Sequence, residues 1–250
     1  MYTLTNAAFA SGLSSLMIVI IGWVLGLYLL KRYFSSRDLN TLALAVILIS
    51  IGSVWLAITI NFILALVNMP FLKSLPYLLI VGWIPGVVSL ATGYVFISIV
   101  KEEYLKPAMI ILGLFLVVNI IISYIFIPFD LLGFKVDNAL TIQPAIGGNL
   151  PNASTNGFFS LLSIVSIIII LLTAVFFLIT AYNTNIQLVK ARAGLLGIGL
   201  LFASFLIIFD SILPIEQISL LIILRFGVVV CLFIMAMAIT LPRRIFKNLS

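Results

Sequence analysis

The feature that most constrains this chain is a series of apolar runs, each longer than 20 residues. A helix that crosses a bilayer needs about 20 mostly apolar residues. Seven runs meet this requirement, at residues 8–30, 41–67, 75–100, 107–127, 158–182, 191–213 and 217–241. Because lipid offers the backbone no hydrogen-bonding partner, each run is expected to be helical. The runs are too long, and alternate too little, for the roughly 10-residue strands of an outer-membrane barrel.

The composition supports the same class of protein. Hydrophobic residues make up 64% of the chain and charged residues 8%, whereas about 25% of the residues in a soluble domain are charged. A soluble globule of this size could not cover its surface with so few charges. The sequence therefore predicts an all-α polytopic membrane protein, a single seven-helix bundle over residues 1–250 that lies in the cell membrane and contacts lipid.

The positions of the basic residues predict an orientation. Ten of the thirteen lie on one side of the predicted bundle: Lys31, Arg32, Arg37, Lys101, Lys106, Lys190, Arg192, Arg243, Arg244 and Lys247. Short cytoplasmic connections are enriched in lysine and arginine. We therefore expect the N-terminus outside and the C-terminus in the cytoplasm. Since topology accounts for these charges, the net charge of +6 does not indicate a nucleic-acid partner.

One connection is much longer than the others. Residues 128–157 form an external loop between the fourth and fifth runs, with strand-like residues at VDNALTIQP and turn residues at GGN and NLPN. A loop of this length is often functional or disordered. It is either a lid with a short hairpin over the outer mouth of the bundle or a simple spacer.

Arg225 lies inside the seventh run, in LLIILRFGVV. A charge near the centre of a spanning helix costs about 2.5 to 3.5 kcal/mol on insertion scales, so Arg225 should face the bundle interior and have a partner. The nearest acids are Asp210 in the sixth run and Glu216 in the turn. The pair is either a clamp between two helices or part of a polar site that binds a ligand or an ion.

Two asparagines lie within runs, Asn61 near the end of the second and Asn119 past the middle of the fourth. Polar residues in such places commonly hold helices together, and otherwise line a solvated cavity. Both interpretations remain open for these two residues, which we include in the candidate polar site.

Pro85 lies inside the third run and is expected to act as a hinge that frees the carbonyl of Val81. Trp83 beside it could then point into a cavity. Residues 22–26 and 82–86 both match GxxxG, a spacing that allows two backbones to approach closely without naming the partner.

The sequence contains few of the residues and motifs that enzymes use. The chain has no histidine and seven carboxylates, and it contains no HExxH, GxGD-like or phosphate-loop pattern. We expect no enzyme, no metal site and no cofactor. Covalent retinal is excluded as well, because no run contains a lysine at depth and Arg225 does not deprotonate.

Two segments resemble a known family. KARAGLLGIGLL at 190–201 opens the sixth run, and LPRRIFKN at 241–248 closes the seventh. Both resemble the corresponding parts of seven-helix sensor modules at the N-terminus of prokaryotic histidine kinases. The chain ends eight residues after Pro242, with no kinase, so the resemblance implies a signal that passes to a separate partner.

These observations lead to a hypothesis of function. The chain is expected to be a receptor-like membrane sensor that binds a ligand or partner from outside. The alternatives are a small-solute transporter that uses the same polar site and a structural subunit of a larger membrane complex.

Overall fold

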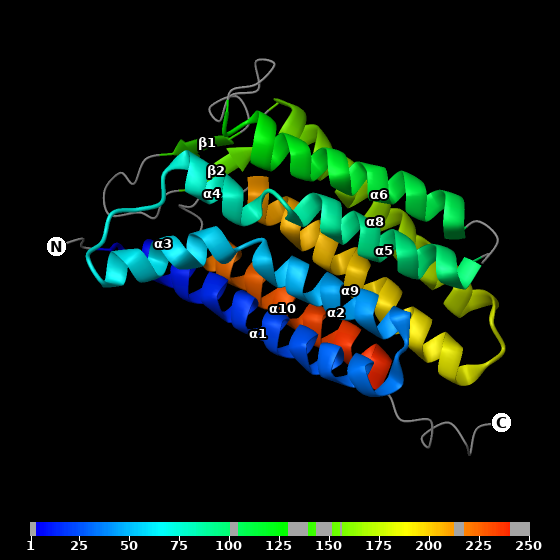
Figure 1. Cartoon of the computed structure of the whole chain (residues 1–250). Helices are drawn as coiled ribbons and strands as arrows, with labels where there is room; N and C mark the ends of the chain where they lie inside the picture. The colour runs from blue at the N-terminus through cyan, green and yellow to red at the C-terminus, as the bar shows by residue number, and fades with distance from the viewer. Residues whose placement is uncertain are drawn as a thin grey trace.

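The computed structural model is a bundle of long helices (Figure 1). It describes residues 4–100, 105–129, 140–143, 152–155, 157–212 and 218–240. The α-helices are α1 (Asn6–Ser36), α2 (Leu39–Ser53), α3 (Leu56–Leu66), α4 (Ser74–Val81), α5 (Ile84–Val100), α6 (Leu105–Ile121), α8 (Gly157–Asn183), α9 (Gln187–Ile212) and α10 (Ile218–Thr240). The π-helix η2 (Ile122–Phe126) continues α6.

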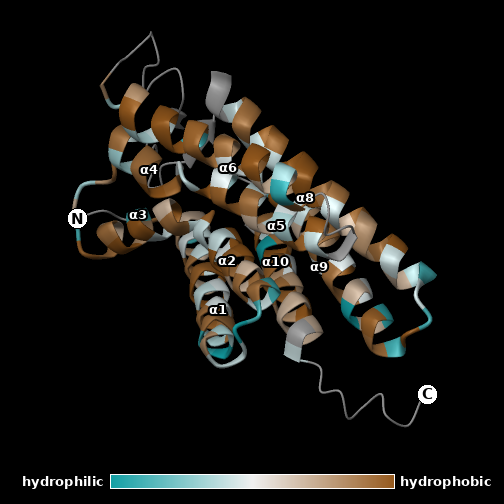
Figure 2. Ribbon diagram, turned by 45° about the vertical axis from the view of Figure 1, so that its right-hand side comes forward, coloured by the Kyte–Doolittle hydropathy of each residue, from teal (hydrophilic) through white to brown (hydrophobic). Residues whose placement is uncertain are grey.

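Six helical segments in the described residues are long and apolar enough to cross a membrane. The pair α2 and α3 passes the same test but is bent by 46°, which brings the count to seven if the pair is one span. Figure 2 shows apolar residues along the lengths of the helices and hydrophilic residues near the ends of α1, α8 and α9. The chain is a multi-pass helical membrane protein.

Most of the helices form a closed ring. In the order α1, α2, α5, α8, α9 and α10, each helix packs against the next, and α10 returns to α1. Every helix of the ring contributes to one core, for example through Ile18, Leu48, Val95, Phe177, Leu200 and Leu232. Helix α6 packs outside the ring against α5. The ring brings the first and last helices, α1 and α10, side by side, which residue spacing alone does not reveal.

The bend between α2 and α3 departs from the single continuous helix expected over 41–67. At the bend, the Ser53 hydroxyl donates to the Ile49 carbonyl at 2.7 Å and the Val54 N–H donates to the Ile51 carbonyl at 3.2 Å. These local bonds compete with the regular helical ladder. The helix α3 then starts from the Trp55 carbonyl, which accepts from the Thr59 N–H at 2.9 Å.

Helix α1 follows both halves of this bent pair. The contacts of the α1 glycines run in opposite sequence order on the two sides: Gly12 meets Phe62, Gly22 meets Gly52, and Gly26 meets Ile49 and Ala45. The bent pair therefore runs antiparallel to α1 along most of its length. The GxxxG spacing at 22–26 makes its close contact with α2.

The helix over the expected run 75–100 is also interrupted. The break lies at Gly82 and Trp83, just before the expected hinge at Pro85, and the ladder of α5 begins where the Val87 N–H donates to the Trp83 carbonyl. Pro85 is thus in the first turn of α5, where its missing N–H costs little. Its carbonyl accepts from the hydroxyls of Ser89 and Ser166, at 2.7 and 2.9 Å.

Within the long connection, β1 (Leu140–Gln143) and β2 (Asn152–Thr155) form an antiparallel pair, with Leu140 opposite Thr155. This pair is the short hairpin considered from the sequence. Residues 130–139 and 144–151 lie outside the described residues, so the lid and the spacer both remain predictions.

Candidate functional site

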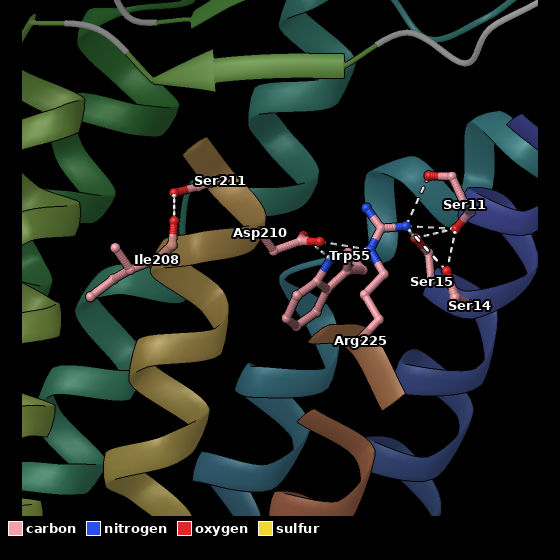
Figure 3. Close-up of polar contacts among 8 residues, drawn as sticks. All are labelled: Ser11, Ser14, Ser15, Trp55, Ile208, Asp210, Ser211 and Arg225. Carbon is pink, nitrogen blue, oxygen red and sulfur yellow. Dashed lines mark hydrogen bonds and ion pairs between the residues drawn. The ribbon is translucent and has the colours of Figure 1, made fainter. Parts of the chain in front are cut away.

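The side chain of Arg225 lies inside the bundle and is 5% exposed. Its Nε donates to Oδ1 of Asp210 at 3.0 Å, and this pair joins α10 to α9 (Figure 3). Asp210 is one of the two partners expected from the sequence. Its side chain is 10% exposed, so both members of the ion pair are buried in the protein interior.

Three serines of α1 hold the other end of the guanidinium. Nη1 of Arg225 donates to the Ser11 carbonyl at 2.7 Å and lies within 2.8 to 3.3 Å of the hydroxyls of Ser11, Ser14 and Ser15. The hydroxyls of Ser14 and Ser15 themselves donate to the Ser11 carbonyl. Their protons are therefore used within α1, which leaves their lone pairs free to accept from the arginine.

Trp55 completes the cluster from the bend between α2 and α3. Its Nε1 donates to Oδ2 of Asp210 at 2.8 Å, and the residue is 2% exposed. Both carboxylate oxygens of Asp210 thus accept a hydrogen bond, one from Arg225 and one from Trp55. We refer to Ser11, Ser14, Ser15, Trp55, Asp210 and Arg225 as the Arg225 cluster.

The chemistry of the Arg225 cluster is that of a fixed charge. An arginine stays protonated in proteins, so it cannot act as a proton carrier or as a base. A buried ion pair gains little net stability but becomes costly when one partner is lost. The cluster is thus suited to hold α1, α9, α10 and the bend in one arrangement.

Among the described residues, no hydrogen bond joins Asn61, Asn119 or Trp83 to this cluster. Asn61 is buried and accepts from the Leu72 N–H at 2.8 Å through Oδ1. Asn119 is buried on α6 and faces Gly86. Trp83 is half-buried at the break before Pro85. Glu216 lies outside the described residues.

Sequence reasoning missed Trp55 and the three serines. The serines occupy positions i, i+3 and i+4 of the first run, a spacing that places them on one face of a helix. That signal was present, but nothing in the sequence shows that this face meets the last helix.

No protein-family model matches the chain, and no curated protein matches it. A functional assignment therefore depends on the geometry of the polar residues.

Proposed function

We propose that this chain is a receptor-like sensor of the cell membrane with seven spans, its N-terminus outside and its C-terminus in the cytoplasm. A ligand or partner binds from the outer side, and the signal leaves through a separate protein. The observation that carries the proposal is the Arg225 cluster, in which one ion pair ties three helices to the bend at Trp55. A group that competes for Asp210 or Arg225 would release that bend.

Two observations support seven spans in this orientation. The antiparallel contacts between α1 and the bent pair α2–α3 continue on both sides of the bend, as expected for one broken span. Counting the pair as one span also places the basic residues around 31–37, 101–106 and 190–192 on the same side, in agreement with the positive-inside rule.

Helix α2 offers a path from the cluster to the other side of the membrane. It extends from the bend at Trp55 to Asp38, whose carboxylate caps the helix by accepting from two backbone N–H groups at 3.2 Å. Ten of its fifteen residues are buried. Beside the cap, Asn40 accepts from the Ser98 hydroxyl of α5 at 2.8 Å. A rigid, buried helix of this kind would carry a change at Trp55 to the basic turn at 31–37.

The test is a measurement at that turn while the cluster is removed. A cysteine at the exposed Ser36, in a Cys231→Ala background, reports the turn through its rate of labelling in membranes. The double variant Arg225→Met/Asp210→Leu removes both charges, so that no unpaired charge is left behind. The proposal expects the labelling rate at position 36 to change when the cluster is removed.

The matched control is Phe177→Ala in α8. Phe177 is 1% exposed and belongs to the core of the ring, so its truncation destabilises the fold by leaving a cavity. The control is expected to lower stability without changing the labelling of the turn. Equal effects of both variants, or no effect of either, would argue that the cluster only holds the fold.

A transporter is the second candidate, because two apolar helices are interrupted, at Trp55 and at Gly82–Trp83. Discontinuous helices often form the binding sites of secondary transporters. Near the first interruption, Ser50 Oγ and Thr59 Oγ1 are buried with no hydrogen-bonding partner among the described residues. Solute flux in liposomes that the Arg225→Met/Asp210→Leu variant abolishes would favour this candidate.

A further inference from the structure

Two irregular segments of the bundle meet beside α4. The C-terminal end of α6 widens into the π-helix η2, and the break between α4 and α5 lies opposite. Ser123 of η2 donates to the Gly82 carbonyl at 3.3 Å, and the Tyr124 hydroxyl donates to the Leu79 carbonyl at 2.7 Å. These bonds attach the C-terminal end of α6 to α4.

Asn119 lies just before η2 and is fully buried. Neither Oδ1 nor Nδ2 has a hydrogen-bonding partner among the described residues. The amide is held close to α5, since a Cβ added to Gly86 would lie 2.8 Å from Oδ1 and 2.9 Å from Leu116 Cδ1. Burying an amide without hydrogen-bonding partners costs free energy. A different packing of α6 that exposes or pairs this amide would remove that cost.

Gly113 of α6 has no role in the packing of the described residues. Among them, a Cβ at this position would meet nothing within 4 Å, and glycine weakens a helix relative to alanine. The preceding residue, Leu112, lies against Gly93 of α5. Gly113 is thus one position along α6 from the residue that contacts Gly93. This spacing suggests a second packing in which Gly113 itself lies against Gly93.

We propose that α6 has a second register, one residue along, which it reaches when η2 closes into an ordinary α-turn. A π-turn contains one residue more than an α-turn. Removing it, with the C-terminal end of α6 held by α4, turns the rest of α6 by about 100° and moves it by about 1.5 Å. Each contact position on α6 then passes to the next residue.

The shifted register explains both anomalies. Gly113 takes the place of Leu112 opposite Gly93, and Ile120 takes the place of Asn119 opposite Gly86. The amide of Asn119 moves to the position that Val118 occupies, where the side chain is 43% exposed. An asparagine on the lipid-facing side of a helix favours association with a polar group of another helix. The device therefore hides Asn119 in one register and presents it to a partner helix in the other.

Disulfide trapping distinguishes the two registers. In a Cys231→Ala background, the pair Gly93→Cys with Leu112→Cys reports the observed register, and Gly93→Cys with Gly113→Cys reports the shifted one. In the unaltered helix, the first pair is expected to dominate by about tenfold or more, as for a major and a minor state.

Asn119→Phe should reverse this preference by at least about tenfold, which corresponds to about 1.4 kcal/mol, because it keeps the chain length but places a ring too large for the contact with Gly86. Deletion of Ile125, which is 45% exposed, removes the extra residue of η2, so a regular helix then holds Leu112 opposite Gly93. The deletion should therefore retain the 93–112 disulfide, also when it is combined with Asn119→Phe. The controls are Ile125→Ala, which keeps the extra residue and should leave the reversal by Asn119→Phe intact, and Val118→Phe, which adds a ring on the exposed face and should retain the 93–112 disulfide.

The proposal is overturned if Asn119→Phe forms the 93–112 disulfide alone. It is equally overturned if Asn119→Phe fails to fold, because a second register that lies close in free energy must accept it. A reversal that survives the deletion of Ile125, or that Val118→Phe produces as well, would also count against it, since the shift would then not depend on η2 or on Asn119.

Discussion

Arg225 is tolerated inside the membrane because its neighbours come from helices that the ring places around it. Asp210 supplies the opposite charge, and the serines of α1 supply the acceptors for Nη1. Each group stabilises the buried charges only while its partners are present. The residue-scale predictions therefore compare the loss of one partner with the loss of two.

Arg225→Leu should destabilise the protein by about 3–5 kcal/mol, because Asp210 is left as a buried charge without its partner. Arg225→Leu/Asp210→Leu should lose clearly less, since no charge remains to be satisfied. Chemical unfolding in mixed micelles measures both. A double variant as unstable as the single one would show that packing around the arginine, and not charge pairing, sets its contribution.

Trp55→Phe removes the hydrogen bond to the charged Asp210, and Trp23→Phe removes a bond of 3.0 Å to the neutral hydroxyl of Ser53. Bonds to charged groups contribute about 1.5–3 kcal/mol and neutral ones about 0.5–1.5 kcal/mol. Trp55→Phe should therefore cost more in the same unfolding experiment. In an Asp210→Asn background, the difference between the free energies of unfolding lost by the two variants should become smaller. A difference that stays constant would mean that the lost ring volume explains it.

At the scale of the elements, glycines set how closely the helices approach. A Cβ at Gly22 would lie 2.8 Å from Gly52 Cα and 3.0 Å from the Leu48 carbonyl oxygen. Both are backbone atoms, so they cannot move aside as a flexible side chain does. Contact between α1 and α2 at this point thus depends on two glycines facing each other.

Gly22→Leu should separate α1 from α2 and destabilise the fold by about 1–3 kcal/mol, the usual cost of overpacking, or by more. Gly194→Ala is the matched control, since among the described residues a Cβ there meets only Ala181 Cβ at 3.8 Å. The control should be neutral or slightly stabilising, because alanine is the better helix former. The midpoints of thermal unfolding for both variants test the prediction, and equal losses would contradict it.

The elements also show which features a sequence can predict. Helical runs follow from hydropathy, and the pairing of Arg225 with Asp210 follows because the two lie on consecutive helices joined by a short turn. No proline marks the bend at Trp55 in the sequence. The bend is accompanied by hydrogen bonds of the Ser53 hydroxyl and of Trp55 with Asp210, an acid 155 residues further along the chain. The serines of α1 join the site only because α10 returns to α1. Contacts of this long range are decided by the order of helices in the ring.

For the whole molecule, the course of α2 and α3 decides how the rest of the chain is threaded through the membrane. A bent pair that crosses gives seven spans, and a re-entrant pair gives six. The continuous contacts with α1 favour crossing. The two threadings differ in which exposed positions share a side.

Single cysteines at Ser36, Met69, Phe129 and Tyr182, all exposed, distinguish these threadings in a Cys231→Ala background. With seven spans, positions 36 and 182 should react with a membrane-impermeant reagent only from the cytoplasm, and positions 69 and 129 only from outside. With a re-entrant pair, position 36 would instead share a side with 69 and 129, and 182 would lie opposite. That result would also put the basic turn at 31–37 on the other side of the membrane from the basic stretch at 190–192. Because short basic connections gather on the cytoplasmic side, we expect the seven-span pattern.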